Sequence, residues 1–209
     1  EIAAAVAEEP HGPGALSDAE RTALAAPATE GLSPSLAGDV PAWLEPHLVR
    51  AFAADAAAEG AALAERADVD LRLNTLKTAP EKALDALASI GAEAIPILTT
   101  AARVPAPDAR ERAPAVDVIP AFNKGWVEVQ DLGSQIAAAA AGDISGAQVL
   151  DFCAGGGGKT LALAALMANK GQLYAWDSDP HRLKPVYERA KRAGVRNLQI
   201  VNPATDKPA

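Results

Sequence analysis

The sequence predicts an α/β protein in which a parallel, doubly wound sheet follows a small α+β region and a helical segment. From residue 126 onward, short apolar stretches alternate with amphipathic stretches through short connections. Residues 69–77 (VDLRLNTLK) alternate apolar and polar side chains, which is typical of a half-buried strand. We therefore expect a helical segment at 1–67, a small α+β domain with a linker at 68–121, and an incomplete sheet of about three parallel strands at 122–209.

The N-terminal half supplies the first elements. Ser17 and Glu20 form a capping-box pattern that predicts a helix start. Residues 40–67 predict one or two amphipathic helices whose core residues are Trp43, Leu44, Leu48 and Phe52.

The next residues complete the small domain. Residues 80–98 predict a helix that begins at Pro80 and stops at Gly91, followed by a short strand. Residues 103–121 are rich in proline and charge, which predicts a linker or an ordered loop.

The C-terminal half has the strand–helix alternation of a parallel sheet. Four segments predict strands: 126–130, 147–153, 171–176 and 195–201. Three segments predict the helices between them: 131–142, about 159–169, and 179–194.

Composition limits the setting of the protein. The chain has 209 residues, is 49% hydrophobic and contains one cysteine, which excludes an internal disulfide and argues against a cysteine-based zinc site. We expect a cytoplasmic protein without a metal. The first ten residues, EIAAAVAEEP, lack the basic region of a secretory signal, and no run of about 18 apolar residues predicts a membrane span. Because the chain begins with Glu rather than Met, we expect a fragment, a processed chain or the ordered part of a longer chain.

Charge is distributed unevenly. The formal net charge is −8, but residues 1–70 hold 13 acidic and 3 basic residues, whereas residues 71–209 hold 14 acidic and 16 basic residues. The acidic excess therefore does not exclude an RNA partner for the second region.

The glycine-rich stretch DFCAGGGGKT, residues 151–160, has three candidate functions. A nucleotide P-loop requires glycine five residues before the Gly158-Lys159 pair, where this chain has Cys153. A dinucleotide fingerprint requires a third glycine or alanine, where this chain has Thr160 or Leu161. The third candidate is a turn that binds S-adenosylmethionine (SAM). Its glycines bring the backbone close to a ligand, and Asp177, at the end of the next strand, is placed to accept hydrogen bonds from ribose hydroxyls.

Four ordered motifs, DLRLNTLK, WVEVQDLGSQ, VLDFCAGGGGKT and AWDSDPHRL, together resemble the RsmB/Sun family of RNA cytosine-5 methyltransferases. The resemblance covers about residues 40–201 and implies a Rossmann-like SAM-dependent methyltransferase sheet, with RNA as the partner and small-subunit ribosomal RNA as the substrate. The family's glycine motif reads Cys-Ala-x-Pro-Gly-Gly-Lys-Thr, and Gly156 stands where proline is usual.

The resemblance also implies roles for particular residues. The cofactor turn would comprise Cys153, Ala154, Gly155, Gly156, Gly157, Gly158 and Lys159. Asp177 would bind the ribose, Arg182 would support the same loop, and Gln130, Asp131 and Ser134 would shape the pocket wall. Candidate RNA contacts are Arg72, Asn74 and Lys77, and a solvated strand face is the alternative for Arg72 and Lys77. A basic run could touch phosphate or simply be solvated: Arg182, Lys184, Arg189, Lys191, Arg192 and Arg196.

The family's chemistry uses a cysteine that attacks carbon 6 of cytosine and a second cysteine that helps release the product. We expect neither in this chain, because Cys153 lies in the cofactor turn and no histidine forms a recognisable dyad with it. Two alternatives remain: an RNA- or SAM-binding protein without catalysis, and a nicotinamide-dependent enzyme, which the failed fingerprint disfavours.

Overall fold

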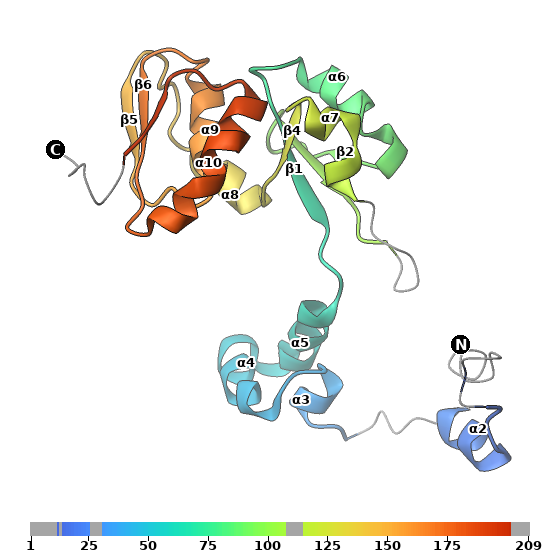
Figure 1. Ribbon diagram of the computed structural model, residues 1–209. Coiled ribbons are helices and arrows are strands. Elements are labelled where there is room, and N and C mark those ends of the chain that lie inside the picture. The colour runs from blue at the N-terminus through green and yellow to red at the C-terminus, as the bar shows by residue number, and fades with distance from the viewer. Residues whose placement is uncertain (1–11, 13, 26–30, 108–114, 202–209) are drawn as a thin grey trace. The chain divides into compact units, whose positions relative to one another are not determined.

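The fold is given by a computed structural model that describes residues 12, 14–25, 31–107 and 115–201 (Figure 1). The chain divides into two compact units, Glu1–Glu65 and Arg66–Ala209. The second unit contains both regions that the sequence separates near residue 121. Within the described residues, no helix has the length and apolar character needed to cross a membrane.

The first unit is helical, as its alanine-rich sequence predicts. Its first described helix begins with the predicted capping box, because Glu20 accepts a hydrogen bond from the Ser17 backbone N–H at 2.7 Å and donates its own N–H to Ser17 Oγ at 3.3 Å. Two other helices pack through a glycine, since a Cβ at Gly38 would lie 2.9 Å from the Ala57 carbonyl oxygen. The helical elements are α2 (Asp18–Ala25), α3 (Pro34–Ala37), η1 (Ala42–Leu44), α4 (Glu45–Phe52), η2 (Ala53–Asp55) and α5 (Ala56–Ala64).

The core predicted for residues 40–67 is smaller than expected. Leu48 is buried, but Trp43 is 71% exposed and Phe52 is 42% exposed. The 3₁₀ segments η1 and η2 interrupt this stretch. Because a 3₁₀ turn has three residues rather than 3.6, successive apolar residues leave the single stripe that a continuous helix would give.

The second unit begins with a four-stranded antiparallel sheet of order β2-β3-β1-β4. Its core consists of apolar side chains from β1, β3, β4 and the helices that cover them, with Leu71, Leu87 and Val127 fully buried. The strands are β1 (Val69–Leu73), β2 (Glu93–Ala94), β3 (Ala101–Val104) and β4 (Val127–Val129), and the helical segments are α6 (Pro80–Asp85), η3 (Ala88–Ile90), η4 (Val116–Val118) and α7 (Pro120–Asn123).

Two strands of this sheet differ from the sequence expectation. β3 overlaps the segment expected to be a loop, and its alanines give little strand propensity on their own. β4, expected to open the parallel region, instead pairs with β1, so that Leu71 faces Val129 and Leu73 faces Val127.

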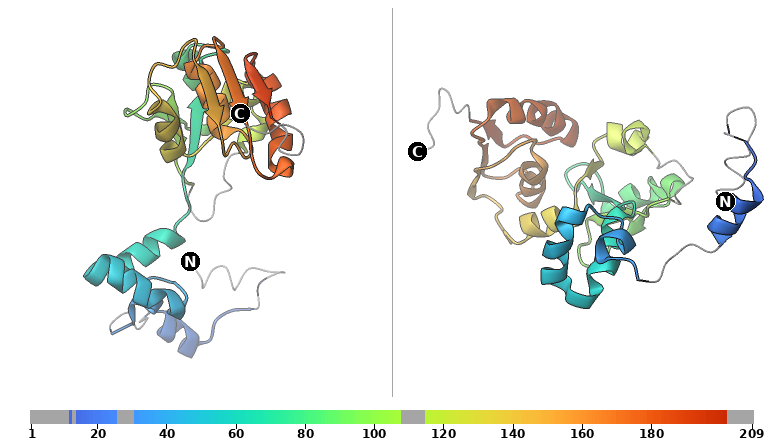
Figure 2. Two further views of the ribbon diagram at one scale, coloured as in Figure 1. Left: turned by 90° about the vertical axis from the view of Figure 1, so that its left-hand side faces the viewer. Right: turned by 90° about the horizontal axis from the view of Figure 1, so that it is seen from below.

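The predicted three-stranded parallel sheet is confirmed, with the order β5-β6-β7. Its strands are β5 (Gln148–Asp151), β6 (Gln172–Ala175) and β7 (Leu198–Ile200), and the associated helices are α8 (Leu132–Ala139), α9 (Gly158–Leu166) and α10 (Pro180–Ala193). In the left view of Figure 2 the strands lie in front of the helices. Leu173 is buried among α9 side chains, while Leu150 and Phe152 remain about half exposed. The carboxyl ends of β5 and β6 lie side by side, because Asp151 pairs with Ala175.

Candidate cofactor-binding site

The four glycines form a tight turn between β5 and α9. Gly155 has φ +51° and Gly157 has φ +83°, both in the left-handed region that favours glycine. The Gly157 N–H donates to the Ala154 carbonyl at 2.8 Å, which closes the turn. A Cβ at Gly157 would lie 3.1 Å from Cγ2 of Val186, so α10 packs directly on the turn.

Asp177 joins this turn to the end of β6. Its Oδ2 accepts a hydrogen bond from Gly155 N–H at 2.9 Å, and its Oδ1 accepts one from Asp179 N–H at 3.0 Å. Hydrogen bonds from Asp179, then from Gly155, together with the Arg182 charge, hold the pKa of Asp177 below its usual value, against the opposing effect of burial. Arg182 Nη1 lies 3.9 Å from Asp177 Oδ2, and its Nη2 lies 3.4 Å from where a Gly155 Cβ would stand. Arg182 therefore borders the loop that the resemblance assigns to it.

The remaining residues of the turn have different surroundings. Ala154 is buried, whereas Cys153 and Lys159 are exposed. Thr160, in the first turn of α9, donates its hydroxyl to Asp151 Oδ2 at 2.7 Å and so fixes the helix start to the end of β5.

These residues fit SAM by two criteria. Gly155 and Gly157 have left-handed φ values that favour glycine, so the turn is built from residues without a Cβ, and α9 begins at Gly158 with N–H groups that have no partner within the helix. Each oxygen of Asp177 accepts one protein hydrogen bond, and a carboxylate oxygen has two lone pairs. Asp177 therefore keeps acceptor capacity for a ribose hydroxyl pair.

Of the expected pocket-wall residues, Gln130 lies next to the turn, and Asp131 and Ser134 form the start of α8. Asp131 caps this helix by accepting Ser134 N–H at 3.0 Å. Gln130 is 6% exposed, and its Nε2 lies 3.8 Å from the Cβ position of Gly158. Its carbonyl accepts a hydrogen bond from Gln135 Nε2 at 2.8 Å.

Two of the three expected RNA contacts are buried, so that expectation is corrected. Arg72 is 5% exposed and donates from Nε to Gln130 Oε1 at 2.8 Å. Burial lowers the pKa of Arg72 to about 10, with Glu128 opposing the shift and Arg189 adding to it. Asn74 is 1% exposed and ties the end of β1 to the end of α10. Lys77, the third of them, is exposed.

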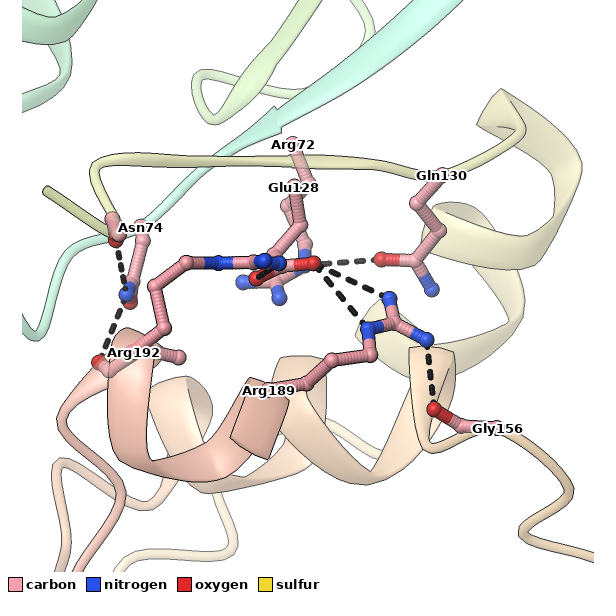
Figure 3. A network of polar contacts seen from close by, with 9 residues as sticks. Arg72, Asn74, Glu128, Gln130, Gly156, Arg189 and Arg192 are labelled. Carbon is pink, nitrogen blue, oxygen red and sulfur yellow. Dashed lines mark hydrogen bonds and ion pairs between the residues drawn. The ribbon is translucent and has the colours of Figure 1, made fainter. Parts of the chain in front are cut away.

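A network missed from the sequence centres on Glu128 of β4, which is 1% exposed (Figure 3). Its Oε2 lies 3.1 Å from Arg189 Nη2 and its Oε1 lies 2.6 Å from Arg192 Nη2. Both arginines belong to the basic run, and their ion pairs with Glu128 leave them less free to bind phosphate. Lys184, Lys191 and Arg196 of the same run are exposed. The available signal was a lone acid between two valines in a predicted strand.

The sequence is similar to known methyltransferases. Residues 142–209 match the family described as 16S rRNA methyltransferase RsmB/F. A relative from Synechocystis, named probable ribosomal RNA small subunit methyltransferase B, is 33% identical over 135 residues, which are 63% of this chain and 29% of the relative. A relative from Escherichia coli, named ribosomal RNA small subunit methyltransferase B, is 34% identical over 158 residues, which are 75% of this chain and 35% of the relative.

The fold has a match among solved structures. A methyltransferase homologue from Pyrococcus horikoshii aligns with a TM-score of 0.68 and 24% identity, covering 84% of this chain and 56% of that chain. The chain spans about a third of the length of the curated relatives it matches. The ordered motifs, the parallel sheet and the sequence matches together show that this chain is similar to the RsmB/Sun family.

Proposed function

We propose that this chain provides the SAM-binding part of a methyltransferase that forms 5-methylcytosine in RNA, with small-subunit ribosomal RNA as the substrate. One observation carries the proposal: the glycine turn and the predicted ribose acid meet at adjacent strand ends, with 2.9 Å between Gly155 N and Asp177 Oδ2. The names of the matched family and of the Escherichia coli relative support the reaction and the RNA class.

Different residues would bind the cofactor and the RNA. The backbone N–H groups at the start of α9, beside the glycine turn, would approach the cofactor, and Asp177, whose pKa is lowered, would accept hydrogen bonds from it at neutral pH. SAM, when bound, supplies the methyl group. The exposed side chains of Lys77, Lys184 and Lys191 are available to RNA phosphates.

A binding function without catalysis is the second candidate, and the cysteine content favours testing it. Cys153 is the one cysteine of the 209 residues, and it directly precedes Ala154 and the four glycines. Attack on cytosine would therefore require a cysteine other than Cys153.

Calorimetry with S-adenosylhomocysteine tests the cofactor assignment. We expect saturable binding that Asp177→Asn weakens about tenfold or more, since a charged acceptor is lost. Asp179→Asn is the matched control: Asp179 caps α10 through His181 N–H at 2.8 Å, and asparagine caps equally well, so affinity should change less than threefold. No binding at millimolar ligand would contradict the proposal, and binding of NADH instead would favour the nicotinamide alternative.

Transfer of a labelled methyl group from SAM tests the reaction. The full-length protein should label small-subunit ribosomal RNA, and digestion should yield 5-methylcytosine. Binding of the cofactor and RNA without any labelling would favour the non-catalytic candidate.

A further inference from the structure

Arg189 of α10 connects the glycine turn to a buried carboxylate. Its Nη1 donates to the carbonyl oxygen of Gly156 at 2.5 Å, and its Nη2 lies 3.1 Å from Glu128 Oε2 (Figure 3). The same guanidinium thus contacts the cofactor turn on one side and the antiparallel sheet on the other. A charged donor makes a stronger hydrogen bond to a backbone carbonyl than a neutral donor does.

Glu128 holds this guanidinium in place. Its side chain is 2% exposed, and its second oxygen lies 2.6 Å from Arg192 Nη2. Arg192 in turn lies over the Phe122 ring at 4.1 Å. Because both oxygens of Glu128 are engaged inside the protein, rotation of Arg189 toward solvent would leave a buried carboxylate with one cation fewer.

The turn requires such a restraint because of its composition. Four consecutive glycines have more backbone freedom than any other residues, and fixing them costs conformational entropy. Gly155 and Gly157 have left-handed φ values, but Gly156 between them does not, so the backbone at 156 does not itself require glycine. It also occupies the position where the related motif carries proline, which would fix φ covalently.

We infer that Arg189 is a positioning residue for the cofactor turn: it holds the Gly156 carbonyl and replaces the rigidity that a proline at 156 would supply. The inference rests on the proposed function, since the turn that Arg189 positions is the one assigned to SAM. A turn held in its binding conformation before the ligand arrives has less entropy to lose on binding.

Two single variants and one double variant test this role in the full chain. Arg189→Ala should weaken S-adenosylhomocysteine binding about tenfold, as expected for loss of a charge-assisted hydrogen bond. Adding Gly156→Pro should restore affinity to within about threefold of wild type. Two observations favour proline at this position: Gly156 N–H donates no hydrogen bond within the described part of the chain, and a Cβ there would have only Arg189 Nη1 near it, at 3.5 Å.

Arg192→Ala is the matched control. Arg192 also pairs with Glu128 and is equally exposed at 25%, but its guanidinium makes no described contact with the turn. Both alanine variants should lose similar stability, whereas only Arg189→Ala should lose cofactor affinity. Equal loss of affinity in both, or failure of proline to rescue, would overturn the inference and leave Arg189 with a purely structural role.

Hydrogen exchange without ligand provides a second readout. The Gly155 and Gly157 N–H groups, bonded to Asp177 and Ala154, should exchange several-fold faster in Arg189→Ala than in wild type or Arg192→Ala. Unchanged exchange would overturn the inference even where a variant is too unstable for calorimetry. Wild-type protein that binds no cofactor, with exchange still accelerated by Arg189→Ala, would instead refute the proposed function while leaving the restraint on the turn supported.

Discussion

Replacement of Asn74 by alanine separates a structural role from a role in RNA binding. Asn74 Nδ2 donates to the carbonyls of Gly125 and Ala193, each at 2.8 Å, and its Oδ1 accepts Leu76 N–H at 3.1 Å. The side chain is 1% exposed, so water does not replace these partners in the folded protein. A side chain in this position joins the antiparallel sheet to the end of α10.

The expected loss of stability follows from these three hydrogen bonds. Each contributes a net ~1 kcal/mol, so Asn74→Ala should lower the free energy of unfolding by about 3 kcal/mol. For a chain of this size that corresponds to a fall in Tm of roughly 6–12 °C. Urea unfolding followed by circular dichroism gives the first quantity, and a thermal melt gives the second.

Lys77→Ala is the control for this experiment. Lys77 is exposed, so its removal should change the free energy of unfolding by less than about 0.5 kcal/mol and should weaken RNA binding measured by fluorescence anisotropy. The opposite pattern would refute the reasoning: an Asn74→Ala protein within about 0.5 kcal/mol of wild type but with weaker RNA binding would restore Asn74 as an RNA contact.

Three further predictions concern the turn and the small sheet. Cys153→Ala should keep labelled-methyl transfer to RNA within about threefold of wild type, and a loss of a hundredfold or more would make Cys153 the nucleophile. Gly157→Ala should lower the free energy of unfolding by about 2–3 kcal/mol, because Gly157 has a left-handed φ and a Cβ there would press against α10. Gly142 has φ +68° but nothing within 4 Å of its Cβ position, so Gly142→Ala should cost only the backbone strain of about 1 kcal/mol. Equal losses in the two variants would contradict the contribution of packing against α10. The hydrogen bond from Arg103 lowers the pKa of Asp70 from 3.8, so ionised Asp70 stabilises the folded protein fully above that pH and loses this effect as pH falls through the lowered pKa. Asp70→Asn should therefore reduce the fall in unfolding free energy at acid pH. An unchanged fall would show that Asp70 does not contribute to it.

The place of the glycine turn in the fold was predictable because its parts are local. Each strand, turn and helix of the parallel sheet is short and follows the previous one directly, so sequence order gives spatial order. The ends of β5 and β6 must then lie together, which brings Gly155 next to Asp177. Neither residue alone would predict this contact.

The antiparallel sheet was harder to predict because its pairings are distant in sequence. β4 pairs with β1 across more than fifty residues, and a three-residue strand contains too few side chains to identify its partner. Alternation along β1 predicted two faces, but it could not show that Gln130 would bind Arg72 or that the end of α10 would bind Asn74. Arg72 and Asn74 therefore resembled surface residues although both are buried.

The buried network also changes what the charge count means for RNA binding. Arg72, Arg189, Arg192 and Glu128 together carry a net charge of +2, which equals the formal charge of residues 71–209. Arg72 and Glu128 are almost fully buried, and the other two arginines are three-quarters buried, so this positive charge is largely withdrawn from the surface. The remaining surface of the region is close to neutral in total. If the proposed function holds, attraction of RNA phosphates depends on where exposed lysines and arginines lie, not on how many basic residues the sequence contains.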